Sequence, residues 1–176
     1  MENLIIVGVD PGTGISSPTG MVIFNPNSCD IIFAEELSST SKTTEHKVKD
    51  ICGAFEAILM IELDKYVNRG WKVVVVFENF VMRGKGGQVL QRLIGALVSR
   101  VPKDFEVIHV YNTTVKKQVG GTGRADKEQV ADGVIHYFRD HDESWRSLRS
   151  LKTNRKFDLL DAFAIGLTGF YVHTTK

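Results

Sequence analysis

The sequence predicts an α/β fold: a mixed five-stranded sheet, three strands antiparallel and then two parallel, flanked by helices. Three observations support it. The first third of the chain holds three short apolar segments separated by Gly, Pro and Asn turns, which is typical of an antiparallel meander. A later segment, residues 71–77, is β-branched nearly throughout, as in a central strand covered on both faces. Strands and segments with helical spacing then alternate. We expect the 176 residues to form one domain, 1–176.

Each element follows from local pattern. The helix after the meander has apolar residues at helical spacing and ends at Asn68-Arg69-Gly70, a typical helix stop. Residues 140–156 are polar, and their pattern favours no regular structure. In chain order we expect strands at 4–9, 20–24 and 31–35, a helix at 42–67, a strand at 71–77, a flexible glycine break at 84–87 followed by a helix at 89–98, a strand at 105–110, a short helix at 115–119, a glycine loop at 120–123 and helices at 125–138 and 157–172.

Composition narrows the class of protein. With 43% hydrophobic and 24% charged residues, the chain resembles soluble globular proteins. No apolar stretch approaches the roughly 20 residues of a membrane span, and the start of the chain lacks a signal-peptide pattern. We therefore expect no membrane partner and a cytoplasmic location, in a bacterium or a phage-infected host. No phosphate-binding loop of the Walker type is present, so we expect no nucleotide cofactor.

Four carboxylates lie where predicted strands end or where the last helix begins. Asp10 and Glu78 close apolar strands, and Asp158 and Asp161 lie one helical turn apart near the start of the last helix. The expected sheet order brings these positions to one edge. Each residue also has an ordinary interpretation, as a turn residue, an exposed strand end or a helix cap. Taken together, the four predict a site for hard divalent cations such as Mg²⁺, which take oxygen ligands. Two such ions about 4 Å apart can hold a scissile phosphate and activate water.

A basic, glycine-rich loop forms a second candidate site. Lys116, Lys117, Arg124 and Lys127 surround the glycines of residues 120–123. Glycines allow a backbone to approach a ligand closely, and the N–H groups at the start of the following helix can bind an anion. A solvated loop is the alternative. Basic segments around a group of acids suit a polyanionic substrate held against metal ions, although solvated helix faces would give the same charge pattern.

Four sequence blocks carry a family resemblance. They are Val-Gly-Val-Asp-Pro-Gly at residues 7–12, Phe-Glu-Asn-Phe at 77–80, the Val-Lys…Gly…Ala-Asp-Lys…Val block at 115–130, and Asp-x-x-Asp-Ala-x-Ala-Ile at 158–165. In this order and at these spacings they resemble the four blocks of the RuvC Holliday junction resolvases. The chain looks like a divergent, bacteriophage-type member of that family.

The resemblance implies a ribonuclease H-like fold, a homodimer and Mg²⁺-dependent paired nicking of four-way DNA junctions, with Mn²⁺ able to substitute. It implies two metal ions per site, held by Asp10, Glu78, Asp158 and Asp161, and products with 5′-phosphate ends. Lys127 would act at the scissile phosphate, and Lys116 is the second candidate for that role. The residues expected to contact DNA are Phe80, Arg83, Lys85, Lys116, Lys117 and Arg124.

Three departures from the family pattern affect specificity. The first hairpin is long, Val81 occupies the place where the family often has an aromatic wedge, and residues 143–156 are longer and more basic than usual. Phe80 is therefore either a displaced wedge or a core residue. We expect relaxed selectivity, with flaps and forks cut as well. The alternatives are a ribonuclease H-like nuclease acting on RNA–DNA hybrids or flaps, and a catalytically silent protein that binds branched DNA.

Overall fold

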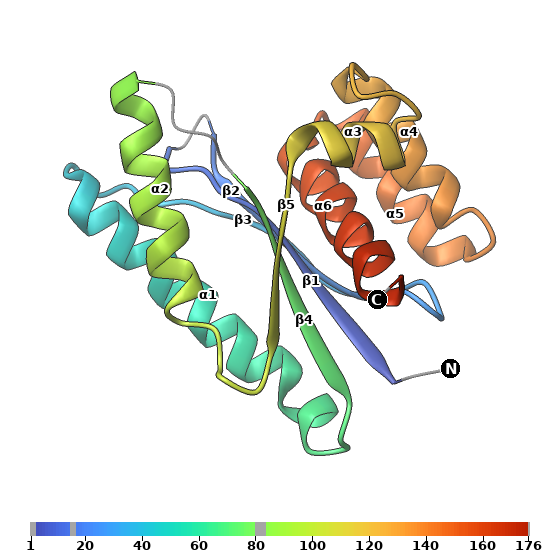
Figure 1. Ribbon diagram of the computed structural model, residues 1–176, viewed down its shortest axis with the longest axis horizontal. Helices are drawn as coiled ribbons and strands as arrows, with labels where there is room; N and C mark the ends of the chain where they lie inside the picture. The colour runs from blue at the N-terminus through green and yellow to red at the C-terminus, as the bar shows by residue number, and fades with distance from the viewer. Residues whose placement is uncertain (1–2, 15–16, 80–83, 176) are drawn as a thin grey trace.

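The computed structural model describes residues 3–14, 17–79 and 84–175. Its centre is a mixed five-stranded sheet of order β3-β2-β1-β4-β5 (Figure 1). The pairs β1/β2 and β2/β3 are antiparallel, and β1/β4 and β4/β5 are parallel, which confirms the predicted fold class. The strands are β1 (Leu4–Asp10), β2 (Thr19–Asn25), β3 (Asp30–Leu37), β4 (Lys72–Glu78) and β5 (Glu106–Val110).

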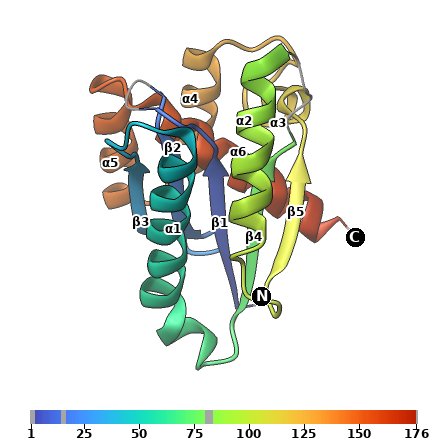
Figure 2. The same ribbon diagram turned by 90° about the vertical axis from the view of Figure 1, so that its left-hand side faces the viewer.

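Helices cover both faces of the sheet. Two of them, α1 and α2, lie side by side on one face, and α6 crosses the other with α3, α4 and α5 beyond it (Figure 2). In the part of the chain that the structure describes, none of the helices combines the length and apolar character needed to cross a bilayer. The bounds are α1 (Thr44–Val67), α2 (Gly84–Val98), α3 (Asn112–Val119), α4 (Lys127–Tyr137), α5 (Asp142–Thr153) and α6 (Phe157–Thr174).

The central strands divide their side chains between two cores. In β1, Ile5, Val7 and Val9 pack with α1 and α2, whereas Leu4 and Ile6 pack with the helices of the opposite face. This follows from the twofold alternation of side chains along a strand. Burial on both faces explains why β1 and β4 are continuous apolar runs rather than alternating ones.

The main helix of the second face, α6, lies unusually close to the sheet. A Cβ added at Gly8 of β1 would lie 2.1 Å from the carbonyl oxygen of Ala162, and one at Gly20 of β2 would lie 2.2 Å from that of Asp158. Any larger residue at these two positions would push the first turns of α6 away. The glycines therefore fix how closely the start of α6 approaches the ends of β1 and β2.

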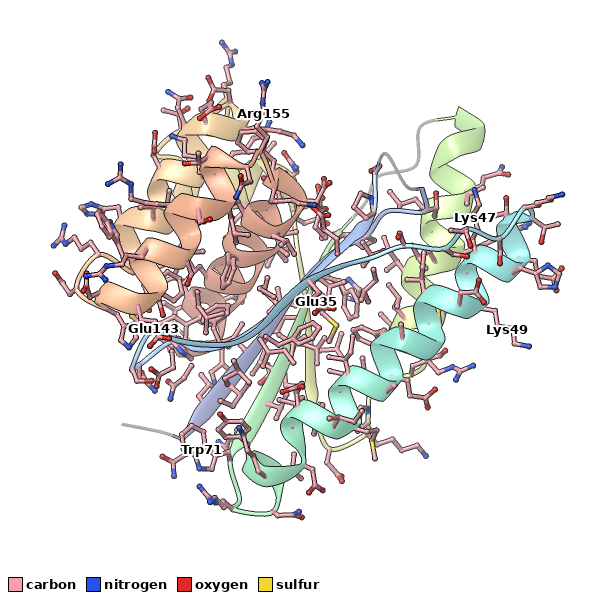
Figure 3. All side chains as sticks on the ribbon, turned by 180° about the vertical axis from the view of Figure 1, so that it is seen from behind. Glu35, Lys47, Lys49, Trp71, Glu143 and Arg155 are labelled. Carbon is pink, nitrogen blue, oxygen red and sulfur yellow. The ribbon has the colours of Figure 1, made fainter. Side chains whose placement is uncertain are left out.

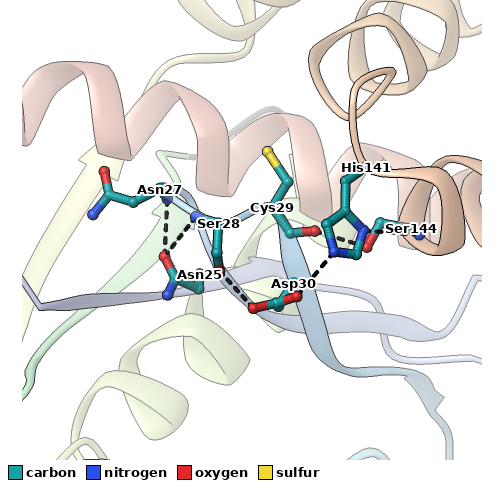
Figure 4. A network of polar contacts seen from close by, with 7 residues as sticks. All are labelled: Asn25, Asn27, Ser28, Cys29, Asp30, His141 and Ser144. Atoms are coloured by element: carbon teal, nitrogen blue, oxygen red, sulfur yellow. Dashed lines mark hydrogen bonds and ion pairs between the residues drawn. The ribbon is translucent and has the colours of Figure 1, made fainter.

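The structure corrects the prediction for residues 140–156, which were expected to be irregular. They contain α5, a twelve-residue helix. Its N-terminus is held by the β2–β3 turn: Ser144 Oγ donates to the carbonyl oxygen of Cys29 at 2.7 Å, and His141 Nε2 lies 3.0 Å from Asp30 (Figure 4). These partners are more than a hundred residues away in sequence, so the local pattern carried no sign of them.

Other boundaries also differ from the prediction. The glycine segment 84–87, expected to be a flexible break, is the first turn of α2. The short helix expected at 115–119 begins at Asn112. The helix expected from residue 125 begins at Lys127, because Asp126 caps it: its side chain accepts from Gln129 N while Gln129 reaches back to the Asp126 N–H.

Candidate active site

Asp10 and Glu78 lie on the same face of the sheet, at neighbouring strand ends. Gly8 of β1 pairs with Val76 of β4, so the residues two positions later project toward the same side. Beyond Asp10, Thr19 holds the backbone at Gly12: its hydroxyl accepts from Gly12 N at 3.0 Å and donates to Gly12 O at 2.7 Å. This buried pair of hydrogen bonds fixes the backbone beyond Asp10.

The first turns of α6 bring the other two predicted carboxylates to this edge. Asp161 lies within a small cavity of about 40 Å³ together with Asp10 and Glu78. Such a volume has room for about one water-sized group. Asp158, one turn earlier on α6, does not line the cavity but is close enough to affect Asp10 electrostatically. The lining consists of Asp10, Glu78, Asn112, Val115, Lys116, Val130, Asp161 and Ile165.

The carboxylates raise one another's pKa values. Burial raises the pKa of Asp10 well above its ordinary value, and the charges of Asp161, Glu78 and Asp158 raise it further. Burial is also the largest cause of the raised pKa values of Glu78, Asp158 and Asp161. Crowded, partly buried carboxylates are unfavourable without a compensating positive charge. The site therefore carries an excess of negative charge that a cation would balance.

Two lysines supply part of that compensation. Lys127 Nζ lies 3.5 Å from Asp161 Oδ2, and its side chain is 63% exposed. It lowers the pKa values of Asp10, Asp158 and Asp161. Lys116 lines the cavity and lowers the pKa of Glu78. Both lysines predicted to act near a phosphate therefore lie beside the carboxylates.

The donor set fits a divalent cation. Carboxylate oxygens are the ligands that Mg²⁺ and Mn²⁺ prefer, and the burial of Asp10 among like charges favours a bound cation. Among the described residues, no group of three or more His, Cys, Asp or Glu side chains is close enough to enclose an ion. An ion bound by several of these carboxylates would draw their side chains closer together than they lie here.

The other residues predicted to contact DNA lie outside the cavity or outside the described part of the chain. Lys117 lies outside the cavity and lines a separate groove with Thr113, Thr114, Gln118 and Gly123. Arg124 is exposed just before α4. Phe80 and Arg83 lie outside the described residues, and of Lys85 only the backbone, in α2, is described.

The sequence interpretation missed Asn112. Its side chain is hydrogen-bonded to Glu78, which lowers the pKa of that carboxyl, and it lines the cavity. Asn112 lies four positions before Lys116, on the same face of α3. That spacing was a usable signal, but it was hidden because the helix was expected to begin only at residue 115.

Comparison with known proteins identifies the family. A family model described as crossover junction endodeoxyribonuclease RuvC matches residues 6–168. The chain belongs to the RuvC family. RuvC proteins from Pseudomonas fluorescens and Pseudomonas syringae are each 27% identical over 176 residues, covering 97% of this chain and 87% of theirs. The RuvC of Acinetobacter baylyi is 29% identical over 126 residues, covering 72% and 66% of the two chains.

Solved RuvC structures share this fold. The Thermus thermophilus RuvC structure superposes with a TM-score of 0.65 at 20% identity, covering 97% of this chain and 96% of the other. A structure of T. thermophilus RuvC in complex with a Holliday junction substrate matches with the same TM-score and coverage at 21% identity. At such low identity the likeness shows the RuvC fold, and the family is one of divalent-metal nucleases.

Proposed function

We propose that this RuvC-family chain is a metal-dependent, structure-specific endonuclease that nicks four-way DNA junctions, with flaps and forks as further substrates. The observation that carries the proposal is the joint placement of partly buried carboxylates and two lysines at one edge of the sheet. Asp10, Glu78 and Asp161 supply oxygen donors, and Lys116 and Lys127 supply positive charge beside them. This combination suits a phosphodiester, whose charge increases as it is attacked.

The four carboxylates would hold two Mg²⁺ or Mn²⁺ ions, which supply a nucleophilic water and stabilise the leaving oxygen of the phosphodiester. Asp10, whose pKa responds to all three of the other carboxylates, would be a ligand together with Glu78, Asp158 and Asp161. Asn112 orients Glu78 through its hydrogen bond. Lys127, exposed and beside Asp161, would contact the scissile phosphate, and the products would carry 5′-phosphate and 3′-hydroxyl ends.

A homodimer accounts for the symmetry of the reaction. A twofold dimer presents two identical sites, and a four-way junction presents two equivalent strands, so paired nicks match the protein symmetry. The exposed face of α2 is the proposed contact between protomers. Support for a branched substrate comes from the T. thermophilus RuvC complex with a Holliday junction, which has this fold.

Cutting assays on a set of substrates test the proposal. Wild type is mixed with a mobile four-way junction, a flap, a fork and an RNA–DNA hybrid, with Mg²⁺, with Mn²⁺ and with EDTA. We expect paired nicks in the junction with either metal and none with EDTA. Asp10→Asn should slow cutting at least about a hundredfold, because it removes a charge from the proposed ligand set. The control is Asp64→Asn, at an exposed position of α1, which should cut like wild type.

Several outcomes would contradict the proposal. Preferential cutting of the hybrid would favour a ribonuclease H-like nuclease of other specificity. Junction binding without cutting under any condition would favour a silent branched-DNA-binding protein. Equal rates for Asp10→Asn and wild type would show that the metal site has been assigned wrongly.

A further inference from the structure

Helix α5 leads directly to the proposed catalytic edge. In Figure 3, Glu143, near the start of α5, lies at one end of the helical layer. Arg155, just after the last turn of α5, lies toward the other end of that layer. The chain then enters α6, which carries Asp158 in its first turn. Lys156, between the two helices, pairs with Glu36 of β3 at 2.5 Å and so ties this junction to the sheet. The C-terminal end of α5 is therefore held beside the carboxylates.

Most basic residues of this segment are already paired. Arg146 pairs with Asp142, and Lys152 contacts Glu128 at 3.1 Å and Asp132 at 2.6 Å. Arg149 and Arg155 differ from them. Both are exposed, and neither has an ion-pair partner within the described ranges. The Arg149 guanidinium lies over the Trp145 ring, with its carbon 4.8 Å from the ring centroid. Arg155 thus offers an exposed guanidinium just after α5, and Arg149 offers a second one within the helix, in a groove that Glu128 and Asp132 also line.

Arg155 also occupies a backbone position that favours glycine. Its φ is 57°, in the left-handed region. The ends of α1 and α5 have the same hydrogen-bond pattern. After α1, Gly70 N donates to Val67 O and Trp71 N to Tyr66 O; after α5, Arg155 N donates to Lys152 O and Lys156 N to Leu151 O. The left-handed position is Gly70 in the first case, with φ 74°, and Arg155 in the second. For folding alone, glycine would be more favourable than arginine at residue 155.

We propose that Arg155 and Arg149 bind the sugar–phosphate backbone of a DNA duplex arm that leaves the cavity along α5. The inference rests on the proposed function and adds a contact surface to it. A guanidinium suits the role because its planar fork can donate two parallel hydrogen bonds to one phosphate. Backbone contacts of this kind position a duplex without reading its sequence.

The test uses variants that remove the charges without harming the fold. Arg155→Gly, Arg149→Gln and the double variant are titrated into a labelled four-way junction in EDTA, with fluorescence anisotropy measured at several salt concentrations. We expect each single variant to raise Kd about three- to tenfold and to reduce the slope of log K against log salt by about one. Arg155→Gly should keep or raise Tm, because glycine suits a positive φ. Arg69→Gln removes an exposed charge in the α1–β4 turn and is the matched control.

The outcomes separate this inference from the proposed function. If wild type cuts junctions while Arg155→Gly and Arg149→Gln keep its Kd and salt slope, the α5 contact is wrong and the nuclease assignment stands. If Arg69→Gln loses as much affinity for the junction, the effect comes from net charge alone, and the proposed α5 contact is wrong. If wild type neither binds nor cuts a junction, the proposed function fails and the contact fails with it.

Discussion

At the scale of single residues, Lys127 is the clearest candidate for a direct role at the phosphate. It is exposed, yet its ammonium group lies 3.5 Å from Asp161. A group placed to meet charge that develops on a substrate must be reachable from solvent and close to the reacting atoms. Lys116 is more enclosed and acts on Glu78, which suits a positioning role better.

We predict that Lys127→Ala lowers the single-turnover cutting rate about a hundredfold, because it removes positive charge where the phosphate gains negative charge. Kd for the junction should change much less. Rapid-quench assays at saturating enzyme measure the rate. Lys117→Ala is the control, since Lys117 is exposed but lies outside the cavity. A loss of rate in Lys117→Ala as large as that in Lys127→Ala would contradict the assignment.

The sequence allowed the convergence of the carboxylates at the cavity to be predicted, whereas their role as metal ligands remains a prediction. Asp10, Glu78 and Asp161 were all predicted, and the structure brings them to one cavity. Acids at the ends of apolar strands are visible in the sequence because their burial is otherwise unfavourable. Asn112 was missed because a neutral amide at a helix start has no such signature. Its importance depends on the rotation of α3 relative to β4, which only packing determines.

At the scale of elements, the position of α6 depends on two glycines beneath it. Gly20 lies under the Asp158 carbonyl, so Gly20→Ala must move the first turn of α6. We predict a loss of about 1–3 kcal/mol in unfolding free energy, typical of overpacking. Cutting should fall further than the fraction of folded protein explains, because Asp158 and Asp161 move with the helix.

Urea unfolding and cutting rates on the same preparations measure the two effects. Gly53→Ala is the matched control: Gly53 is exposed in α1, and a Cβ there meets nothing within 4 Å. It should stabilise the fold by about 0.5–1 kcal/mol through helix propensity alone and leave cutting unchanged. Unchanged cutting by folded Gly20→Ala would show that the start of α6 tolerates displacement.

The elements differed in how well local pattern revealed them. Buried strands and α6 were predicted because long apolar runs have few alternative structures. Helix α5 was missed because few of its side chains are buried, with Ser144 and Leu148 the main ones. The hydroxyl of Ser144 is buried against the β2–β3 turn, a contact invisible to local periodicity. The first turn of α2 was missed for a related reason, since its glycines favour a break unless the rest of the helix is packed.

At the scale of the whole molecule, the proposed dimer places an exposed face of α2 at a twofold axis. Gly95 marks that face: it is exposed, and a Cβ there meets nothing within 4 Å of the same chain. Leu93 and Leu97, on the opposite side of α2, are fully buried in the core. A side chain added at residue 95 would therefore reach a partner without disturbing its own protomer.

We predict that wild type has twice the chain mass of 19.6 kDa in solution and that Gly95→Arg is a stable monomer. Multi-angle light scattering measures the mass, and Gly53→Arg on α1 is the control. The monomer should lose coordinated nicking of the two opposed strands, which a cruciform plasmid assay detects as nicked circles in place of linear product. A dimeric Gly95→Arg would place the interface elsewhere.

The carboxylates of the cavity come from opposite ends of the chain, from residue 10 in β1 to residue 161 in α6. No fragment that stops short of α6 can contain the complete set. Contacts between distant parts of a chain form late and slowly, since loop closure must precede them. Recovery of cutting during refolding should therefore lag behind the helical circular dichroism signal. The appearance of nuclease activity would then report when α6 docks on the sheet during folding.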